Sequence, residues 1–183
     1  MEKSVIIGGF GGQGILFLGK ILAHAGMLEG KEVTWFPSYG AEMRGGAANC
    51  TVVISDELIG SPVVSRPDAL VAMSDESLKR FHQKIKNGGI LFLDSSLINN
   101  IEDLRKDIEI VAVPATELAG RLGSTKSANM ILLGALISRT RILSESSVVK
   151  AIDSSMPDNK RNLAAGNKKA LAEGIRHIED KKS

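Results

Sequence analysis

The sequence is poor in cysteine, histidine and aromatic residues. Its 183 residues include one cysteine, three histidines, five phenylalanines, one tryptophan and one tyrosine. A single cysteine excludes a disulfide within the chain and leaves no cysteine cluster for an iron–sulfur centre or a cysteine-type zinc site. Because Cys50 lies in the apolar run ANCTVVIS, we expect it to be a small buried side chain.

The chain also lacks a strong charge bias and long apolar runs. Its formal net charge of +2 gives no argument for nucleic acid or for an anionic membrane surface. No run approaches the roughly 18 apolar residues of a membrane span, and the amino-terminal apolar stretch is too short for a signal peptide. We therefore expect a cytoplasmic protein with one domain, 1–183, that binds neither nucleic acid nor a membrane.

Short apolar runs alternate with helical patterns along the first two thirds of the chain. Six strands are predicted, at 4–8, 32–36, 48–55, 68–73, 90–94 and 108–113. Helices are predicted at 15–30, 75–87, 116–123, 127–140, 144–156 and 159–180. Strands this rich in Val, Ile and Leu are typical of a sheet covered on both faces. The pattern predicts a three-layer α/β/α fold with a mostly parallel sheet, a Rossmann-like first half and a helical C-terminal part.

What the sequence does have is glycine near its amino end. Eleven of the 19 glycines lie between Gly8 and Gly46, and the segment GFGGQG (9–14) is a G-x-G-x-x-G pattern between a predicted strand and a predicted helix. Amide groups at such a helix start attract anions, and missing side chains let a phosphate approach. A dinucleotide site also needs an acidic residue at the end of the second strand. The second strand ends in Trp35, Phe36 and Pro37 instead, which argues against a nicotinamide dinucleotide site.

A second glycine cluster, FPSYGAEMRGGAAN (36–49), follows the second strand. Aromatic residues, Met and Arg favour the centres of protein–protein contacts, and Glu42 and Arg44 could contact a substrate or form a surface ion pair. If the first two strands are parallel, both glycine segments leave the sheet at the same edge. We find no nucleophile–base pair and no metal-ligand spacing in either segment.

These segments carry a family resemblance. The stretches GFGGQGI (9–15), GKEVTWFPSYGAEMRGGAANCTVVIS (30–55), IGSPVVSRPDALVAMS (59–74) and SANMILLGALI (127–137) resemble the gamma subunit of the 2-oxoacid:ferredoxin oxidoreductases, in particular the 2-oxoglutarate and 2-oxoisovalerate types. The residues that match the family's first loop are Gly9, Gly11, Gly12, Gln13 and Gly14. Those that match its second motif are Ser38, Tyr39, Gly40, Glu42, Met43, Arg44, Gly45 and Gly46.

The resemblance implies a role inside a larger enzyme. Such complexes decarboxylate a 2-oxoacid on thiamine diphosphate with Mg²⁺, pass electrons through [4Fe–4S] clusters to ferredoxin, and transfer the acyl group to coenzyme A. Thiamine diphosphate and clusters are expected on the alpha, beta and ferredoxin-like delta subunits, while the matched loops of this chain are expected near coenzyme A. The chain alone is then expected to be inactive, and its sequence does not say which 2-oxoacid is used. The alternatives are a free-standing nucleotide-binding protein and a purely structural subunit.

Overall fold

A computed structural model describes residues 1–38, 47–99, 101, 104–156 and 161–181. Its strands are β1 (Glu2–Phe10), β2 (Glu32–Ser38), β3 (Ala47–Ser55), β4 (Ala69–Ala72), β5 (Ile90–Asp94) and β6 (Glu109–Val113). Its helices are α1 (Ile15–Leu28), α2 (Asp75–Phe81), α3 (Ala115–Arg121), α4 (Ala128–Thr140), α5 (Glu145–Ser155) and α6 (Arg161–Asp180), with short 3₁₀ turns at His82–Lys84 and Thr125–Ser127.

The six strands form one sheet in the order β2-β3-β1-β4-β5-β6. The pairs β1–β4, β4–β5 and β5–β6 are parallel, whereas β3 runs antiparallel to both β1 and β2. A parallel crossover needs a dozen or more residues, and only residues 39–46 join β2 to β3, so the chain must return as a hairpin. The predicted mostly parallel α/β sheet is confirmed, with β3 as its antiparallel member.

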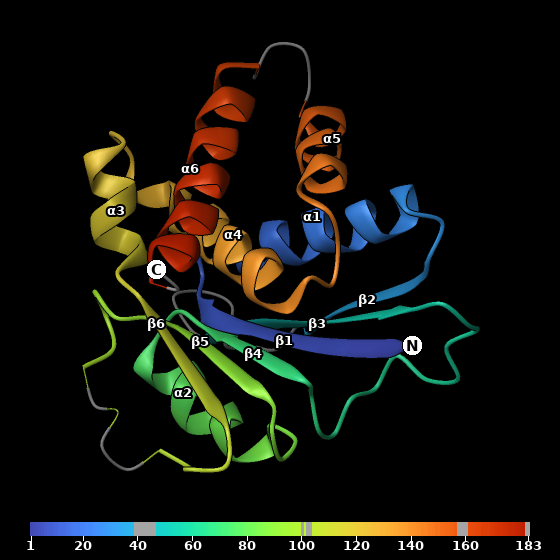
Figure 1. Cartoon of the computed structure of the whole chain (residues 1–183). Helices are drawn as coiled ribbons and strands as arrows, with labels where there is room; N and C mark the ends of the chain where they lie inside the picture. Colours follow the sequence, from blue (N-terminus) through green and yellow to red (C-terminus); the bar gives the residue numbers. More distant parts are fainter. Residues whose placement is uncertain (39–46, 100, 102–103, 157–160, 182–183) are drawn as a thin grey trace.

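The helices cover the two faces of the sheet unequally (Figure 1). On one face α1, α3, α4, α5 and α6 build the larger hydrophobic core, and on the other face α2 and the segment after β5 cover a smaller one. This gives the three layers that the alternation of strands and helices predicts. The helix predicted at 75–87 is shorter than expected, because α2 ends at Phe81 and a 3₁₀ turn leads towards β5.

Helix α4 lies at the centre of the larger layer. Residues 128–138 of α4 are all buried, as its nearly all-apolar sequence predicts. Gly134 of α4 and Gly174 of α6 let the two helices approach closely, since a Cβ at Gly134 would lie 2.1 Å from the Leu171 carbonyl oxygen. Within the described part of the chain, no helix is both long and apolar enough to cross a lipid bilayer.

Candidate functional site

The glycine turn, defined as residues 9–14, lies at the topological switch point of the sheet, where the chain connections pass to helices on opposite faces. Strand β1 leads into α1 on one face, and its parallel neighbour β4 leads into α2 on the other (Figure 1). The carboxyl ends of two such strands form the crevice in which open α/β sheets bind ligands. The turn therefore occupies the position that this fold favours for a binding site.

Several of the glycines in this stretch are required by the protein's own packing. A Cβ at Gly8 would lie 2.8 Å from the Ser77 Cβ of α2, and one at Gly9 would lie 2.5 Å from the Gln13 Oε1. A Cβ at Gly14 would lie 2.3 Å from the Asn129 Nδ2. Gly12 differs, because its φ of +96° favours glycine while no atom lies within 4 Å of a Cβ there. Gly11 and Gly12 are the exposed glycines of the turn.

The Gln13 side chain forms hydrogen bonds within the turn and to the end of the neighbouring strand β4. Its Oε1 accepts a hydrogen bond from the Phe10 amide at 2.6 Å, and its Nε2 donates to the Met73 carbonyl oxygen at 2.9 Å. The Met73 amide in turn donates to the Gly8 carbonyl oxygen at 2.8 Å. The Gln13 side chain thus ties the turn to the end of β4 and holds the turn in shape.

Helix α1 begins without a side-chain cap. Gly14 is its N-cap residue, with φ 75°, and the first turn of α1 contains no acidic residue. The first amide groups of a helix have no intrahelical acceptor and carry partial positive charge. Ser74 and Ser77 form a capping box on α2, and the buried Asp94 accepts hydrogen bonds from Thr116 at the start of α3. The start of α4 resembles that of α1 in having no cap from its N-cap side chain, although Asn129 accepts a hydrogen bond from its own helix. The uncapped start of α1, next to the exposed glycines of the turn, is therefore suited to an anion.

Asn129 is a site residue that sequence reasoning missed. It is buried in the first turn of α4, and its Nδ2 donates to the Gly14 carbonyl oxygen at 3.1 Å. Its Oδ1 accepts from the Met130 amide at 2.9 Å. The signal in the sequence was a single polar residue opening an otherwise apolar helix, but only the tertiary structure shows that it positions the turn.

The second glycine cluster leaves the sheet at the same edge as the turn. In the register of the sheet, Ser38 at the end of β2 lies opposite Asn49 of β3, and Asn49 lies opposite Gly8 of β1. Of the site residues predicted in this cluster, Ser38 lies within the described residues, and it is exposed. The others lie outside the described residues, namely Tyr39, Gly40, Glu42, Met43, Arg44, Gly45 and Gly46.

Three aromatic residues beside this edge are exposed to different degrees. The Trp35 side chain is 36% exposed, and its indole lies against α1, where its Nε1 would be 3.0 Å from a Cβ at Gly19. Phe36 is 51% exposed and Phe10 is 40% exposed. Residues that lie directly opposite each other in a sheet share a face. Phe36 lies opposite Thr51, and Thr51 lies opposite Ile6, so the Phe36 ring is on the face of the sheet that carries α2. Exposed rings at this edge form a surface suited to protein contact.

Cys50 does not belong to the chemistry of the site. It is fully buried beneath α1, and burial raises the pKa of its thiol to about 12 although the Trp35 indole hydrogen-bonds to it. The expectation of a buried, unreactive side chain is confirmed.

The chain is an α/β protein whose glycine turn and uncapped helix start lie at the topological switch point of its sheet. The family model described as pyruvate ferredoxin/flavodoxin oxidoreductase matches residues 4–177, and the chain belongs to this family.

Relatives within and around this family differ in length. The chain is 39% identical to the 2-oxoglutarate synthase subunit KorC of Methanocaldococcus jannaschii, with 92% of each chain covered. It is 42% identical over 136 residues to the ketoisovalerate oxidoreductase subunit VorA of Methanothermobacter thermautotrophicus, covering 74% of this chain but only 28% of that protein. A solved 2-oxoglutarate:ferredoxin oxidoreductase from Magnetococcus marinus, with 2-oxoglutarate, coenzyme A and succinyl-CoA bound, shares the fold with a TM-score of 0.90 at 24% identity, over 98% of this chain and 31% of that one.

Proposed function

We propose that this chain is the gamma-type subunit of a 2-oxoacid:ferredoxin oxidoreductase and that its glycine turn contributes to binding coenzyme A. The observation that carries the proposal is the uncapped start of α1 at the winding change of the sheet. The match over nearly the full length of KorC supports the subunit assignment, and the coenzyme A in the Magnetococcus enzyme supports the ligand.

The turn divides the predicted site residues by role. Gly9, Gln13 and Gly14 shape the turn through internal contacts, whereas Gly11 and Gly12 are exposed and carry no side chain that would keep a phosphate from the start of α1. Ser38 and the motif residues 39–46 complete the site in this proposal. No acidic residue occupies the described end of β2, which reads Trp35, Phe36, Pro37 and Ser38, so the free-standing nucleotide-binding alternative has less support.

The partners follow from the same proposal. Thiamine diphosphate, Mg²⁺ and the [4Fe–4S] clusters belong to alpha, beta and ferredoxin-like delta subunits, and ferredoxin accepts the electrons. The exposed Phe10 and Phe36 are the rings through which this chain contacts its partners. In VorA and in the Magnetococcus chain, the segment similar to this chain is under a third of a longer polypeptide, which fits close packing against other domains of the enzyme.

A substitution at Gly11 tests the ligand role in the assembled complex. Gly11 is exposed, so Gly11→Val adds bulk at the surface of the turn that a ligand would approach. We expect the KM for coenzyme A to rise about tenfold or more while the KM for the 2-oxoacid stays unchanged. Gly166→Ala, at an exposed position of α6 with open space around it, is the matched control.

The outcome separates the two remaining functions. A Gly11→Val complex that assembles with unchanged coenzyme A kinetics would show that the turn does not bind the ligand. Loss of assembly in Gly11→Val, with normal assembly of Gly166→Ala, would favour a purely structural subunit. Phe36→Glu tests the contact surface separately and should weaken assembly. Leu163→Glu on α6 is its control, because the Phe36 and Leu163 side chains are both more than half exposed.

A further inference from the structure

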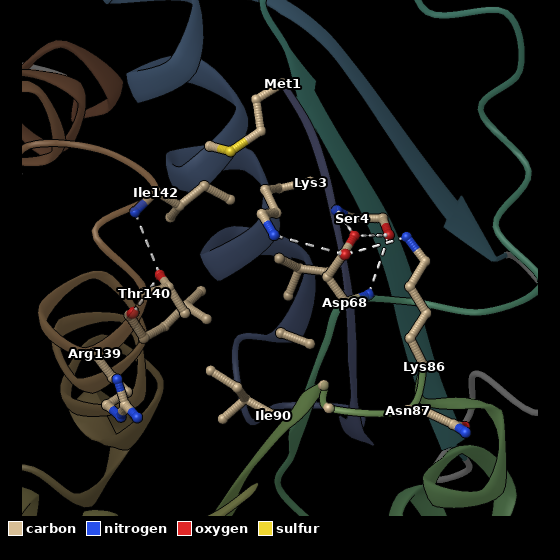
Figure 2. Close-up of a pocket in the computed structure, with 15 residues that line it drawn as sticks. Met1, Lys3, Ser4, Asp68, Lys86, Asn87, Ile90, Arg139, Thr140 and Ile142 are labelled. Carbon is tan, nitrogen blue, oxygen red and sulfur yellow. Dashed lines mark hydrogen bonds and ion pairs between the residues drawn. The ribbon is translucent and has the colours of Figure 1, made fainter. Parts of the chain in front are cut away.

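A cavity of about 400 Å³ opens at the edge of the sheet opposite the glycine turn (Figure 2). It lies where β1, β4 and β5 begin and where α4 ends. Its apolar wall is formed by Val5, Ala69, Ile90, Leu136 and Ile142. Ligand pockets of this kind combine an apolar lining with a few placed polar groups.

The polar side of the cavity is organised around Asp68. Its Oδ2 accepts hydrogen bonds from the Ser4 amide and the Ser4 hydroxyl, both at 2.8 Å. Its Oδ1 lies 3.1 Å from the Lys86 Nζ and 3.9 Å from the Lys3 Nζ. Burial alone would raise the pKa of Asp68, but the hydrogen bonds from Ser4 and Lys86 lower it below its ordinary value. Asp68 is therefore a fixed carboxylate that two ammonium groups share.

Lys3 is the group that this arrangement leaves incompletely satisfied. At 3.9 Å from Asp68 it is too distant for a hydrogen bond, and within the described residues its ammonium group donates none. Figure 2 shows its side chain directed between Asp68 and the end of α4. Among the further cations of the wall, Arg139 is already paired by two 2.6 Å hydrogen bonds with Glu109, which does not line the cavity, and the Met1 amino group is paired with Asp56.

We propose that this cavity binds a small organic carboxylate with an apolar body. The carboxylate head lies between Lys3 and Lys86, where one negative charge balances the excess positive charge and occupies the free donors of Lys3. The carboxyl end of α4 carries partial negative charge, which disfavours a carboxylate on that side of the cavity. The apolar body of the ligand therefore lies there, against Leu136 and Ile142. The site is independent of the glycine turn, and its ligand is not the one assigned there.

The test uses the full chain and three probes that separate charge from apolar contact. Hexanoate carries both features, hexan-1-ol has the body without the charge, and acetate has the charge with almost no body. We expect hexanoate to shift the backbone amide resonances of Val5, Ala69 and Gly89 in a saturable way, with much weaker effects from the other two. Lys3→Met should weaken hexanoate binding about tenfold, because it removes one charge-assisted contact and leaves the Ser4–Asp68–Lys86 contacts in place.

Two controls make the result decisive. Lys150→Met removes an exposed charge on α5, away from the cavity, and should bind hexanoate as the unchanged chain does. Lys3→Arg keeps the charge and should retain most of the affinity. The proposal is overturned if hexan-1-ol binds as well as hexanoate, if Lys3→Met binds with unchanged affinity, or if hexanoate gives no saturable shift up to about 10 mM, ten times a dissociation constant of about 1 mM.

Discussion

The close crossing of α4 and α6 makes Gly134→Ala a sharp test of the packing that supports the site. A Cβ at Gly134 would lie 2.1 Å from the Leu171 carbonyl oxygen and 3.0 Å from the Ile175 amide nitrogen. Both are backbone atoms, so neither can turn aside, and ordinary contact requires the helices to separate by about 1 Å. Overpacking of this kind costs about 1–3 kcal/mol or more.

The gain in helix propensity opposes this cost but does not cancel it. Replacing glycine by alanine inside a helix contributes about 1 kcal/mol. Gly166→Ala isolates that gain, because open space surrounds the position in α6. We therefore expect Gly166→Ala to raise the free energy of unfolding by about 0.5–1 kcal/mol and Gly134→Ala to lower it by about 2 kcal/mol.

Urea and thermal unfolding measure the difference directly. For a chain of this length each 1 kcal/mol moves the melting temperature by about 2–4 °C, so the two variants should differ by about 5–10 °C. Gly174→Ala, whose Cβ would lie 2.0 Å from the Ile131 carbonyl oxygen, should behave like Gly134→Ala. If Gly134→Ala and Gly166→Ala change the stability in the same direction, the inferred close approach of α4 to α6 is wrong.

Three further predictions concern single side chains. Gln13→Ala removes the hydrogen bonds to Phe10 and Met73 and should lower the free energy of unfolding by about 1–3 kcal/mol, measured in urea. Burial lowers the pKa of His177 below its ordinary 6.5, so the unfolded chain binds more protons there; stability should fall as the pH drops below 6.5, and less so in His177→Leu. Because burial holds the pKa of Cys50 at about 12, iodoacetamide at pH 8 should label it only as the chain unfolds, and labelling of the folded chain would contradict its burial.

The fold could be predicted from the sequence because its strands are short apolar runs between clear breaks. Each of the six strands was found within two residues of its expected bounds, and β1 is longer, Glu2–Phe10, because β3 pairs with it along its whole length. The antiparallel direction of β3 follows from the short connection at 39–46, a geometric limit that residue patterns alone did not bring out. The early end of α2 was missed because the helical pattern continues beyond Phe81, where the chain turns towards β5.

The site was harder to predict, because one sequence pattern serves two physical purposes. The glycines of the turn suggested an open surface. At Gly9 and Gly14, however, the space that a side chain would need is occupied by Gln13 and Asn129. Only Gly11 and Gly12 remain exposed. No sequence pattern distinguishes a glycine that admits a ligand from one that admits the protein's own side chain, since the backbone requirement is the same. Asn129 was missed for a related reason: its partner Gly14 is 115 residues away.

The glycine turn is suited to binding a ligand rather than to reacting with it. At the glycine turn the described residues offer amide groups and a helix start, while the polar side chains of Gln13 and Asn129 are engaged in holding the turn. Such a turn can bind and orient an anion, but it cannot move a proton or an electron pair. Its value depends on how accurately α4 and β4 fix it, because a displaced helix start changes both the position and the direction of its dipole. If the turn binds coenzyme A as proposed, packing variants such as Gly134→Ala should therefore weaken that binding as well as stability, whereas a ligand held by flexible side chains alone would tolerate a shift of α4.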